Sequence, residues 1–215
     1  IRLSGGVFMN VKLNKVIGEL PEVDDLFVFP SCGDETNAIG AAWAFLADRG
    51  EAQTIVPLES LYIGAEPESQ EYEAAARTAE QLGWDVSKPA DLEDAVADLL
   101  ARGEVVARVS GREEFGARAL GNRSILADPT SPDVVKVVNR AIKSRDFWMP
   151  FAPSVMQEYA DEYMDNPKGF SAPYMILAFD SRNTDDVKAA CHPEDGTIRP
   201  QIVTTQSNPD YHRIL

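Results

Sequence analysis

Residues 104–129 read EVVARVSGREEFGARALGNRSILADP, and this stretch decides the fold prediction. Its first part, Glu104–Ser110, has the apolar spacing of a strand and runs directly into a loop rich in glycine and arginine. A strand that feeds such a loop presents hydrogen-bond donors at the edge of an α/β sheet, where ligands commonly bind. The stretch therefore predicts an α/β protein with a binding site at this edge.

The same region is a cationic island in an acidic chain. The 215 residues carry a formal net charge of −15, yet residues 108–145 contain eight Lys and Arg against four Asp and Glu. Guanidinium groups donate paired hydrogen bonds to phosphate or carboxylate, and glycines let backbone N–H groups approach the same anion. We expect an anion site here; the alternative is a solvated face or pairing with the acidic surface. The candidates are Arg112, Arg118, Arg123, Lys143 and Arg145.

Helical and strand patterns alternate along the chain, which predicts an α/β or α+β fold. Ser131 is expected to cap a helix whose first position is Pro132. Asp91 is expected to cap a helix whose apolar face carries Leu92, Val96 and Leu99. The predicted helices are Val7–Ile17, Asn37–Asp48, Ser69–Leu82, Asp91–Arg102, Ser131–Lys143 and Ser154–Met164, and the predicted strands are Ile1–Leu3, Leu26–Phe29, Glu104–Ser110 and Ala172–Phe179.

Composition narrows the class of protein. The 44% hydrophobic content suits a globular chain, and no apolar run is long enough for a transmembrane helix. Cys32 and Cys191 are far apart and lack metal-type spacing, so we expect no disulfide framework and a cytoplasmic location. The net acidity argues against broad binding to nucleic acid or to anionic membranes.

Five motifs together resemble the O-carbamoyltransferase family, which includes the nodulation-factor and antibiotic carbamoyltransferases. The resemblance follows the order of the chain over nearly its whole length. The motifs are LSGGVFMNVKLN (Leu3–Asn14), FVFPSCGDETNAIGAA (Phe27–Ala42), GREEFGARALGNRSILADP (Gly111–Pro129), NRAIKSRDFWMPFAPS (Asn139–Ser154) and HPEDGTIRPQIV (His192–Val203).

The resemblance implies two parts. Residues 1–57 would be the tail of an actin-like ATPase-fold domain, similar to the enzyme that makes threonylcarbamoyl-adenosine in tRNA. Residues 62–215 would be most of a YrdC-like α/β domain built on a twisted sheet. The family's metal-binding histidines lie in an N-terminal portion that this sequence does not contain, and the chain begins without Met, so we expect a piece of a longer polypeptide.

The chemistry implied by the resemblance has two steps. Carbamoyl phosphate and ATP would form a carbamoyl-adenylate, and the carbamoyl group would then pass to a hydroxyl of a small-molecule acceptor such as a natural product or sugar. Both reactants are dense anions that an arginine cluster can bind. The implied cofactors are ATP and, in the full-length enzyme, iron or another divalent metal; a homodimer stays open.

The resemblance also assigns roles to residues. In and after the cationic island, Arg112, Arg118, Lys143 and Arg145 would contact the phosphates or the carbamoyl group. Of these, Arg118, Lys143 and Arg145 would be catalytic. The second choices for these contacts are Arg123, Ser124 and Arg199. In the actin-like part, Gly5, Gly6 and Asn10 would contact nucleotide and Asp34 would ligate the metal. The structural alternatives are an ordinary turn at Gly5 and Gly6 and a helix cap at Asp34. Two departures stand out: Ala117 replaces a frequent Pro, and Met149 replaces a frequent Arg.

Two other functions remain open at this point. One is carbamoyl or threonylcarbamoyl transfer to tRNA or to a maturation protein, which the domain order and the motifs at Pro150–Pro153 and Asp195–Thr197 disfavour. The other is a non-catalytic module that binds RNA through the arginine island, against which the net charge of −15 weighs.

Overall fold

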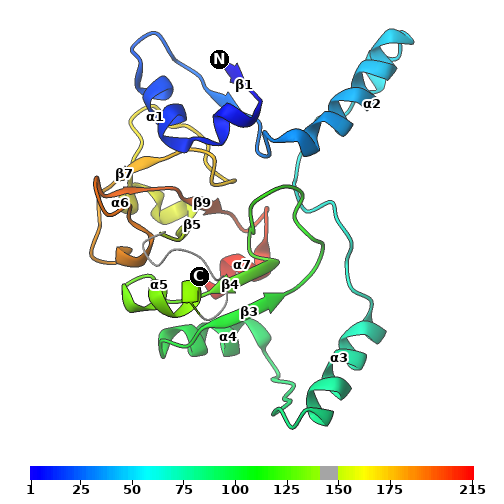
Figure 1. The fold of residues 1–215 in the computed structure, drawn as a ribbon, viewed down its shortest axis with the longest axis vertical. Helices are drawn as coiled ribbons and strands as arrows, with labels where there is room; N and C mark the ends of the chain where they lie inside the picture. Colours follow the sequence, from blue (N-terminus) through cyan, green and yellow to red (C-terminus); the bar gives the residue numbers. More distant parts are fainter. Residues whose placement is uncertain (141–149) are drawn as a thin grey trace.

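The structure is a computed structural model that describes residues 1–140 and 150–215. Within these residues the main body holds four small sheets flanked by helices, and two helices extend away from it (Figure 1). This mixture of helices and small sheets fits the predicted α/β class. The likeness to YrdC-like and actin-like domains stays a prediction. Two predicted catalytic residues, Lys143 and Arg145, lie outside the described residues, as does Met149.

The N-terminal segment is a strand, a short helix pair and a second strand. Strand β1 (Arg2–Leu3) pairs in parallel with β2 (Phe27–Val28), close to the two predicted strands. Between them lie the 3₁₀ helix η1 (Gly6–Met9) and helix α1 (Val11–Glu19).

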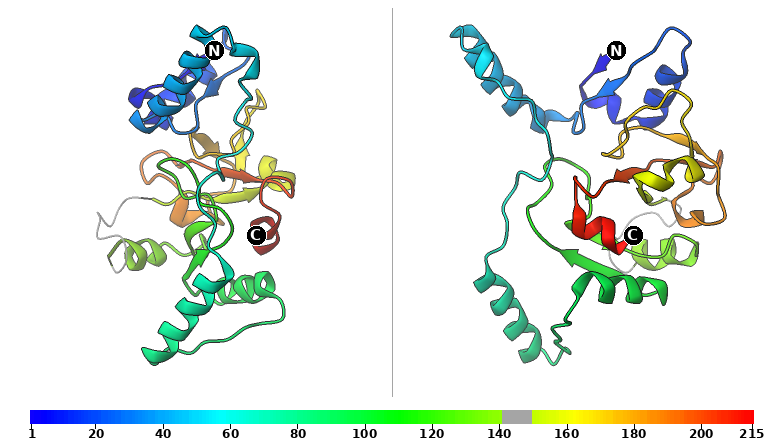
Figure 2. Two further views of the ribbon diagram at one scale, coloured as in Figure 1. Left: turned by 90° about the vertical axis from the view of Figure 1, so that its right-hand side faces the viewer. Right: turned by 180° about the vertical axis from the view of Figure 1, so that it is seen from behind.

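Helices α2 (Asn37–Asp48) and α3 (Ser69–Gln81) confirm two predicted helices almost to the residue. A short 3₁₀ turn, η2 (Asp34–Thr36), leads into α2, and another, η3 (Ala52–Thr54), follows it. Both α2 and α3 extend away from the body in Figure 1 and in the right-hand view of Figure 2, and neither contains a buried residue.

The predicted strand at Glu104–Ser110 is confirmed as β3 (Val106–Val109). It pairs antiparallel with β4 (Arg123–Leu126), so the arginine–glycine loop connects the two strands. Helix α4 (Leu92–Ala101) packs beside the C-terminal helix α7 (Pro209–Ile214). As predicted, Asp91 caps α4: its Oδ1 accepts a hydrogen bond from the backbone N–H of Asp94 at 3.1 Å.

The C-terminal half holds the other two sheets. Strand β5 (Ser154–Met156) pairs in parallel with β9 (Gln201–Val203). Strands β6 (Met164–Asp165), β7 (Phe179–Ser181) and β8 (Thr197–Ile198) form an antiparallel sheet in that order. The short helical elements are α5 (Asp133–Val138), η5 (Gln157–Tyr159), α6 (Ala160–Tyr163) and η6 (Lys188–Ala190).

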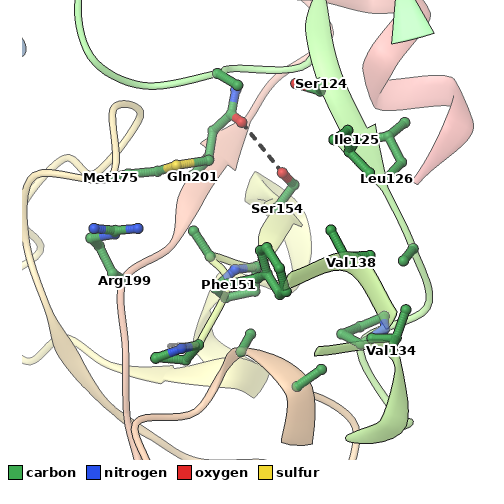
Figure 3. A pocket seen from close by; sticks show the side chains of 18 of the residues that line it. Ser124, Ile125, Leu126, Val134, Val138, Phe151, Ser154, Met175, Arg199 and Gln201 are labelled. Carbon is green, nitrogen blue, oxygen red and sulfur yellow. Dashed lines mark hydrogen bonds between the residues drawn. The ribbon is translucent and has the colours of Figure 1, made fainter. Parts of the chain in front are cut away.

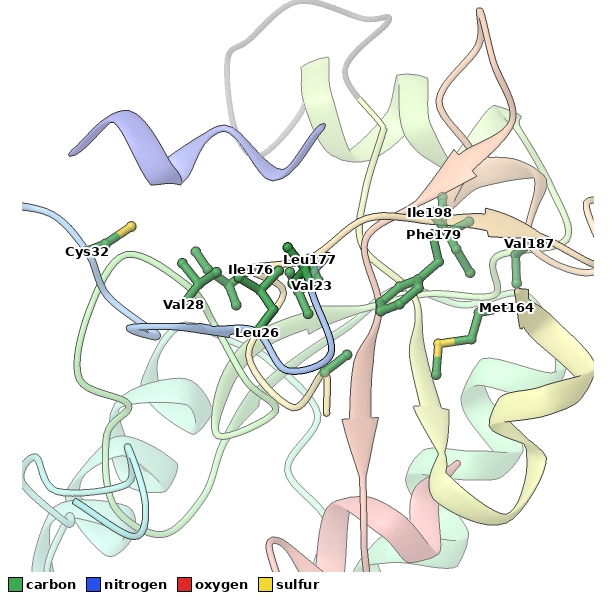
Figure 4. Packing of buried hydrophobic residues seen from close by; sticks show 12 residues of the cluster. Val23, Leu26, Val28, Cys32, Met164, Ile176, Leu177, Phe179, Val187 and Ile198 are labelled. Atoms are coloured by element: carbon green, nitrogen blue, oxygen red, sulfur yellow. The ribbon is translucent and has the colours of Figure 1, made fainter. Parts of the chain in front are cut away.

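The largest hydrophobic core joins the N-terminal segment to the C-terminal half. Val23, Leu26 and Val28 pack in one cluster with Ile176 and Leu177, and the cluster also takes in the buried thiol of Cys32 (Figure 4). Residues on both sides of the predicted boundary near residue 57 therefore share one buried apolar surface, whose removal from water stabilises their contact.

Three element predictions were wrong. Ser154–Met164 is not one helix, because Ser154–Met156 pairs with β9 and buries Val155, a β-branched residue that suits a strand. Residues 172–178 are mostly buried but irregular, and Met175 has a φ of 56°. Ser131 does not cap α5, whose N-cap is Pro132 without a side-chain hydrogen bond.

Candidate anion-binding pocket

A cavity of about 280 Å³ lies between β4, α5, the segment after Pro150, and β9 (Figure 3). One part of its lining is apolar and includes Leu126, Val138 and Phe151. The polar part contains seven side chains that can bond a ligand. These are Arg118, Ser124, Asp128, Ser154, Arg199, Gln201 and Tyr211. The cavity thus joins an apolar wall to two arginines, as small-molecule sites commonly do.

The loop that carries Arg118 is shaped by two glycines. Gly116 has φ +103°, and a Cβ there would stand 2.4 Å from Oγ of Ser31. Gly121 has φ +111°, and a Cβ there would stand 2.4 Å from the ring of Tyr211. Both positions combine a backbone conformation that favours glycine with a close approach to another segment. The loop therefore lies between the N-terminal Ser31 turn and the C-terminal helix.

The guanidinium of Arg118 is half-buried in this lining. Within residues 1–140 and 150–215 it donates no hydrogen bond and forms no ion pair. Burial lowers the pKa of Arg118, and the neighbouring thiol of Cys32 partly opposes this shift. An arginine stays protonated at neutral pH even so. A half-buried cation that lacks a protein anion is suited to receive an anionic ligand.

A chain of hydrogen bonds crosses the pocket floor. The hydroxyl of Tyr211 donates to Oγ of Ser154 at 2.7 Å. Oγ of Ser154 donates in turn to Oε1 of Gln201 at 3.3 Å (Figure 3). Nε2 of Gln201 donates in turn to the carbonyl of Leu120 at 2.8 Å. Burial raises the pKa of Tyr211 to about 12, so its hydroxyl stays protonated and keeps its donor role.

Two predicted anion ligands lie outside this lining. Arg112 donates to the carbonyls of Ile63 and Gly64 at 2.9 and 3.1 Å. Arg123 donates to the carbonyls of Ser110 and Gly111 at 2.9 and 3.0 Å, among others. These guanidinium groups fasten backbone segments to one another.

Ser124 and Arg199, the other two second-choice residues, do line the pocket with Arg118. Oγ of Ser124 also accepts a hydrogen bond from the backbone N–H of Gly121 at 2.9 Å, so it helps to shape the loop. The structure therefore brings three predicted side chains together: Arg118, Ser124 and Arg199.

The predicted nucleotide-contacting turn lies elsewhere, in the N-terminal segment. Gly5 and Gly6 are exposed, and no atom lies within 4 Å of a Cβ built on either. Oδ1 of Asn10 accepts a hydrogen bond from the N–H of Leu13 at 3.1 Å, which makes Asn10 the N-cap of α1. The turn is accessible, and its asparagine side chain supports the helix.

Asp34 begins η2 and is exposed. No group of three or more His, Cys, Asp or Glu side chains that could hold a metal ion occurs within the described ranges. Asp34 supplies one carboxylate there, so these residues alone do not fit a metal site.

Sequence reasoning missed four polar lining residues. Asp128, Ser154, Gln201 and Tyr211 reach the pocket from separate places in the chain. Gln201 had a signal, since it alternates with Arg199 in the stretch Ile198–Val203 and two alternating residues of a strand share a face. Tyr211 carried no such signal, because its place depends on how α7 packs.

Comparisons with known proteins identify the family of the chain. Residues 97–215, more than half of the chain and nearly all of the pocket, match the family described as carbamoyltransferase C-terminus, and residues 1–43 match carbamoyltransferase N-terminus. The chain belongs to the carbamoyltransferase family.

Curated relatives cover the whole chain. Nodulation protein NolO of Bradyrhizobium diazoefficiens is 34% identical over 215 residues, which make up 99% of this chain and 39% of that protein. Nodulation protein U of Sinorhizobium fredii is 34% identical over 216 residues, or 99% of this chain and 36% of that protein. An uncharacterized protein of Methanocaldococcus jannaschii is 34% identical over 228 residues, or 100% of this chain and 36% of its own length. The chain thus spans less than two-fifths of the length of each of these relatives.

None of the helices formed by residues 1–140 and 150–215 combines the length and apolar character that crossing a bilayer requires.

Proposed function

We propose that this chain carries the activation site of an O-carbamoyltransferase that uses carbamoyl phosphate and ATP. The observation that carries the proposal is the guanidinium of Arg118, which lines a cavity with Arg199 and has no ion-pair partner in the part of the chain that the structure describes. Two arginines suit a ligand that bears several phosphate oxygens. Membership of the carbamoyltransferase family supplies the reaction class.

In the proposed site, Arg118 and Arg199 bind phosphate oxygens and offset the negative charge that develops as a phosphoryl or carbamoyl bond breaks. Ser124 and Ser154 offer hydroxyl donors beside them. The apolar wall at Val138 and Phe151 gives a flat ring such as adenine a surface to pack on.

The proposed overall activation step is balanced in atoms. Carbamoyl phosphate, ATP and water give carbamoyl-adenylate, pyrophosphate and phosphate. In the second step a hydroxyl of a small-molecule acceptor attacks the carbamoyl carbon, and AMP leaves with the hydroxyl proton released to solvent. In this proposal the pocket around Arg118 binds the reactants of the activation step, and the acceptor binds mainly in a part of the full-length enzyme beyond this chain.

Exchange of labelled pyrophosphate into ATP tests the activation step. The proposal predicts exchange that requires carbamoyl phosphate and that Arg118→Ala abolishes. Arg77→Ala is the matched control, because Arg77 lies on α3, is 63% exposed and, among the described residues, pairs only with Glu73 at 3.7 Å. Exchange that proceeds equally in Arg118→Ala would remove Arg118 from the proposed site. A folded native chain that shows no exchange would contradict the adenylate route in this chain.

A further inference from the structure

The carboxylate of Glu114 accepts several hydrogen bonds from backbone amides of the arginine loop, residues 111–123. Its Oε1 accepts hydrogen bonds from the N–H groups of Leu120 and Asn122, both at 2.8 Å, and of Arg123 at 3.1 Å. Three amides that converge on one carboxylate oxygen form a tight, charge-assisted arrangement. Glu114 is itself half-buried at the start of the loop and is not part of the pocket lining.

The remaining polar groups of this turn are also bonded. The N–H of Gly121 donates to Oγ of Ser124 at 2.9 Å, so four successive amides at 120–123 all have side-chain acceptors. On the carbonyl side, Leu120 accepts from Nε2 of Gln201 at 2.8 Å. The backbone after Arg118 is therefore fixed by hydrogen bonds, and Glu114 accepts three of the four amide bonds at 120–123.

The side chain of Arg118, in contrast, forms no hydrogen bond within the described part of the chain. It lies two residues before Leu120, and no hydrogen bond or ion pair to the described residues fixes its guanidinium. Its place in the pocket therefore follows from the backbone that Glu114 holds. We propose that Glu114 is a positioning residue for anion binding by Arg118. This inference rests on the proposed function, since it assumes that Arg118 contacts the ligand.

The direction in which anion affinity changes distinguishes a positioning role of Glu114 from a through-space effect of its charge. Removing a negative charge beside an anion site strengthens anion binding if the charge acts only through space. The variant Glu114→Gln keeps the length and one acceptor oxygen but loses the charge that strengthens three hydrogen bonds. A positioning role predicts the opposite result, which is weaker binding.

Glu113 provides the matched control. It is the neighbouring acid, its side chain is 55% exposed, and among the described residues its carboxylate forms one ion pair, with Nε of Arg123 at 3.7 Å. The variant Glu113→Gln removes the same charge from the same loop without touching the amides that Glu114 holds.

Protection of Arg118 from an arginine-specific dicarbonyl gives a readout on that residue alone. The native chain and each variant are treated with phenylglyoxal at rising concentrations of carbamoyl phosphate, with and without ATP, and modified arginines are located by mass spectrometry. Arg112 is the internal reference, because it is exposed and lies outside the pocket lining. Thermal unfolding of each variant shows that it is folded.

We expect half-protection of Arg118 in Glu114→Gln to require on the order of tenfold more ligand than in the native chain. Glu113→Gln should match the native chain or need slightly less ligand. Glu114→Asp, which keeps the charge but withdraws the carboxylate by one methylene, should also lose protection and serves if Glu114→Gln does not fold.

Two results would overturn the inference, and they differ from failure of the proposed function. Unchanged or stronger protection in Glu114→Gln, or native protection in Glu114→Asp, would show that Glu114 does not position Arg118. Absence of Arg118 protection in the folded native chain would instead contradict the proposed function itself.

Discussion

The loop from Gly111 to Arg123 and the projecting helix α2 are held in place by different kinds of interaction. In the loop, side chains from distant segments bond the backbone, as when Gln201 donates to the carbonyl of Leu120. In α2, all residues except Asn37, Gly40 and Asp48 are apolar, the backbone bonds are internal to the helix, and no residue is buried. The loop is held by the rest of the molecule, whereas α2 is held by its own helical hydrogen bonds.

The comparison shows whether local or long-range interactions determine the structure of each region. The regular helix depends on local propensity, so most single substitutions in it should have small effects on unfolding. The loop depends on close approaches and on satisfied polar groups, so single substitutions in it should have large effects. The following predictions test this difference, from the largest expected effect to the smallest.

Gly121→Ala should lower the free energy of unfolding by about 2–5 kcal/mol, because it adds a Cβ at φ +111° that would stand 2.4 Å from the ring of Tyr211. Urea unfolding followed by circular dichroism measures this. Gly83→Ala is the control, because Gly83 has φ +77° but no atom within 4 Å of its Cβ position. Equal losses in the two variants would show that the Tyr211 contact is unimportant.

Arg123→Ala should lower the free energy of unfolding by about 1–3 kcal/mol, because several buried or half-buried carbonyls lose their donor. Arg118→Ala should change it by less than about 0.5 kcal/mol, because no described residue bonds to that side chain. Denaturant unfolding of both variants makes the comparison. A larger loss in Arg118→Ala would mean that Arg118 is structural.

Gly40→Ala should favour folding of α2 by about 0.5–1 kcal/mol. Gly40 lies inside this helix, and no atom stands within 4 Å of its Cβ position. Helix content by circular dichroism on heating measures the change. Loss of helix content would show that α2 needs glycine for a close contact.

The smallest expected effect concerns the ion pair between Lys12 of α1 and Asp195, which joins the N-terminal segment to the C-terminal half. The hydrogen bond from Lys12 holds the pKa of Asp195 well below its ordinary value of 3.8. The resulting stability is present above about pH 4 and is lost as the pH falls further, because protonation removes the charge. Both groups are about two-fifths exposed, so the contribution should stay below about 1 kcal/mol.

Asp195→Asn should therefore lower stability slightly at pH 7 and make the acid-induced loss shallower. Unfolding at several pH values between 3 and 7 checks this. Asp85→Asn is the control, since Asp85 forms no ion pair within the described part of the chain. Identical pH profiles for native protein and Asp195→Asn would contradict a role for the pair.

Local patterns predicted the helices best. The bounds of α2 and the cap at Asp91 were readable because helix periodicity and capping are properties of neighbouring residues. Ser154–Met156 was misread as helix because its parallel pairing with Gln201–Val203 is a contact between segments far apart in sequence. The burial of individual apolar residues could not be predicted fully either. Leu92 and Leu99 lie on the predicted apolar face of α4 with Val96, yet of these three only Val96 is buried.

The candidate site shows the same division. The glycine–arginine composition indicated that Arg118 belongs to an anion site, and the structure places it in a pocket with Ser124 and Arg199. The sequence could not separate it from Arg112 and Arg123, because the difference lies in whether backbone carbonyls occupy each guanidinium. Lys143 and Arg145 lie outside the described residues, so their predicted roles stay predictions.

Calorimetric titration with carbamoyl phosphate and with ATP tests the central claim most directly. The native chain should bind both ligands saturably, and Arg118→Ala should weaken binding by on the order of a hundredfold while leaving the unfolding transition in place. Arg77→Ala should bind like the native chain. Equal affinity in Arg118→Ala and the native chain, or no binding by the folded native chain, would contradict the account.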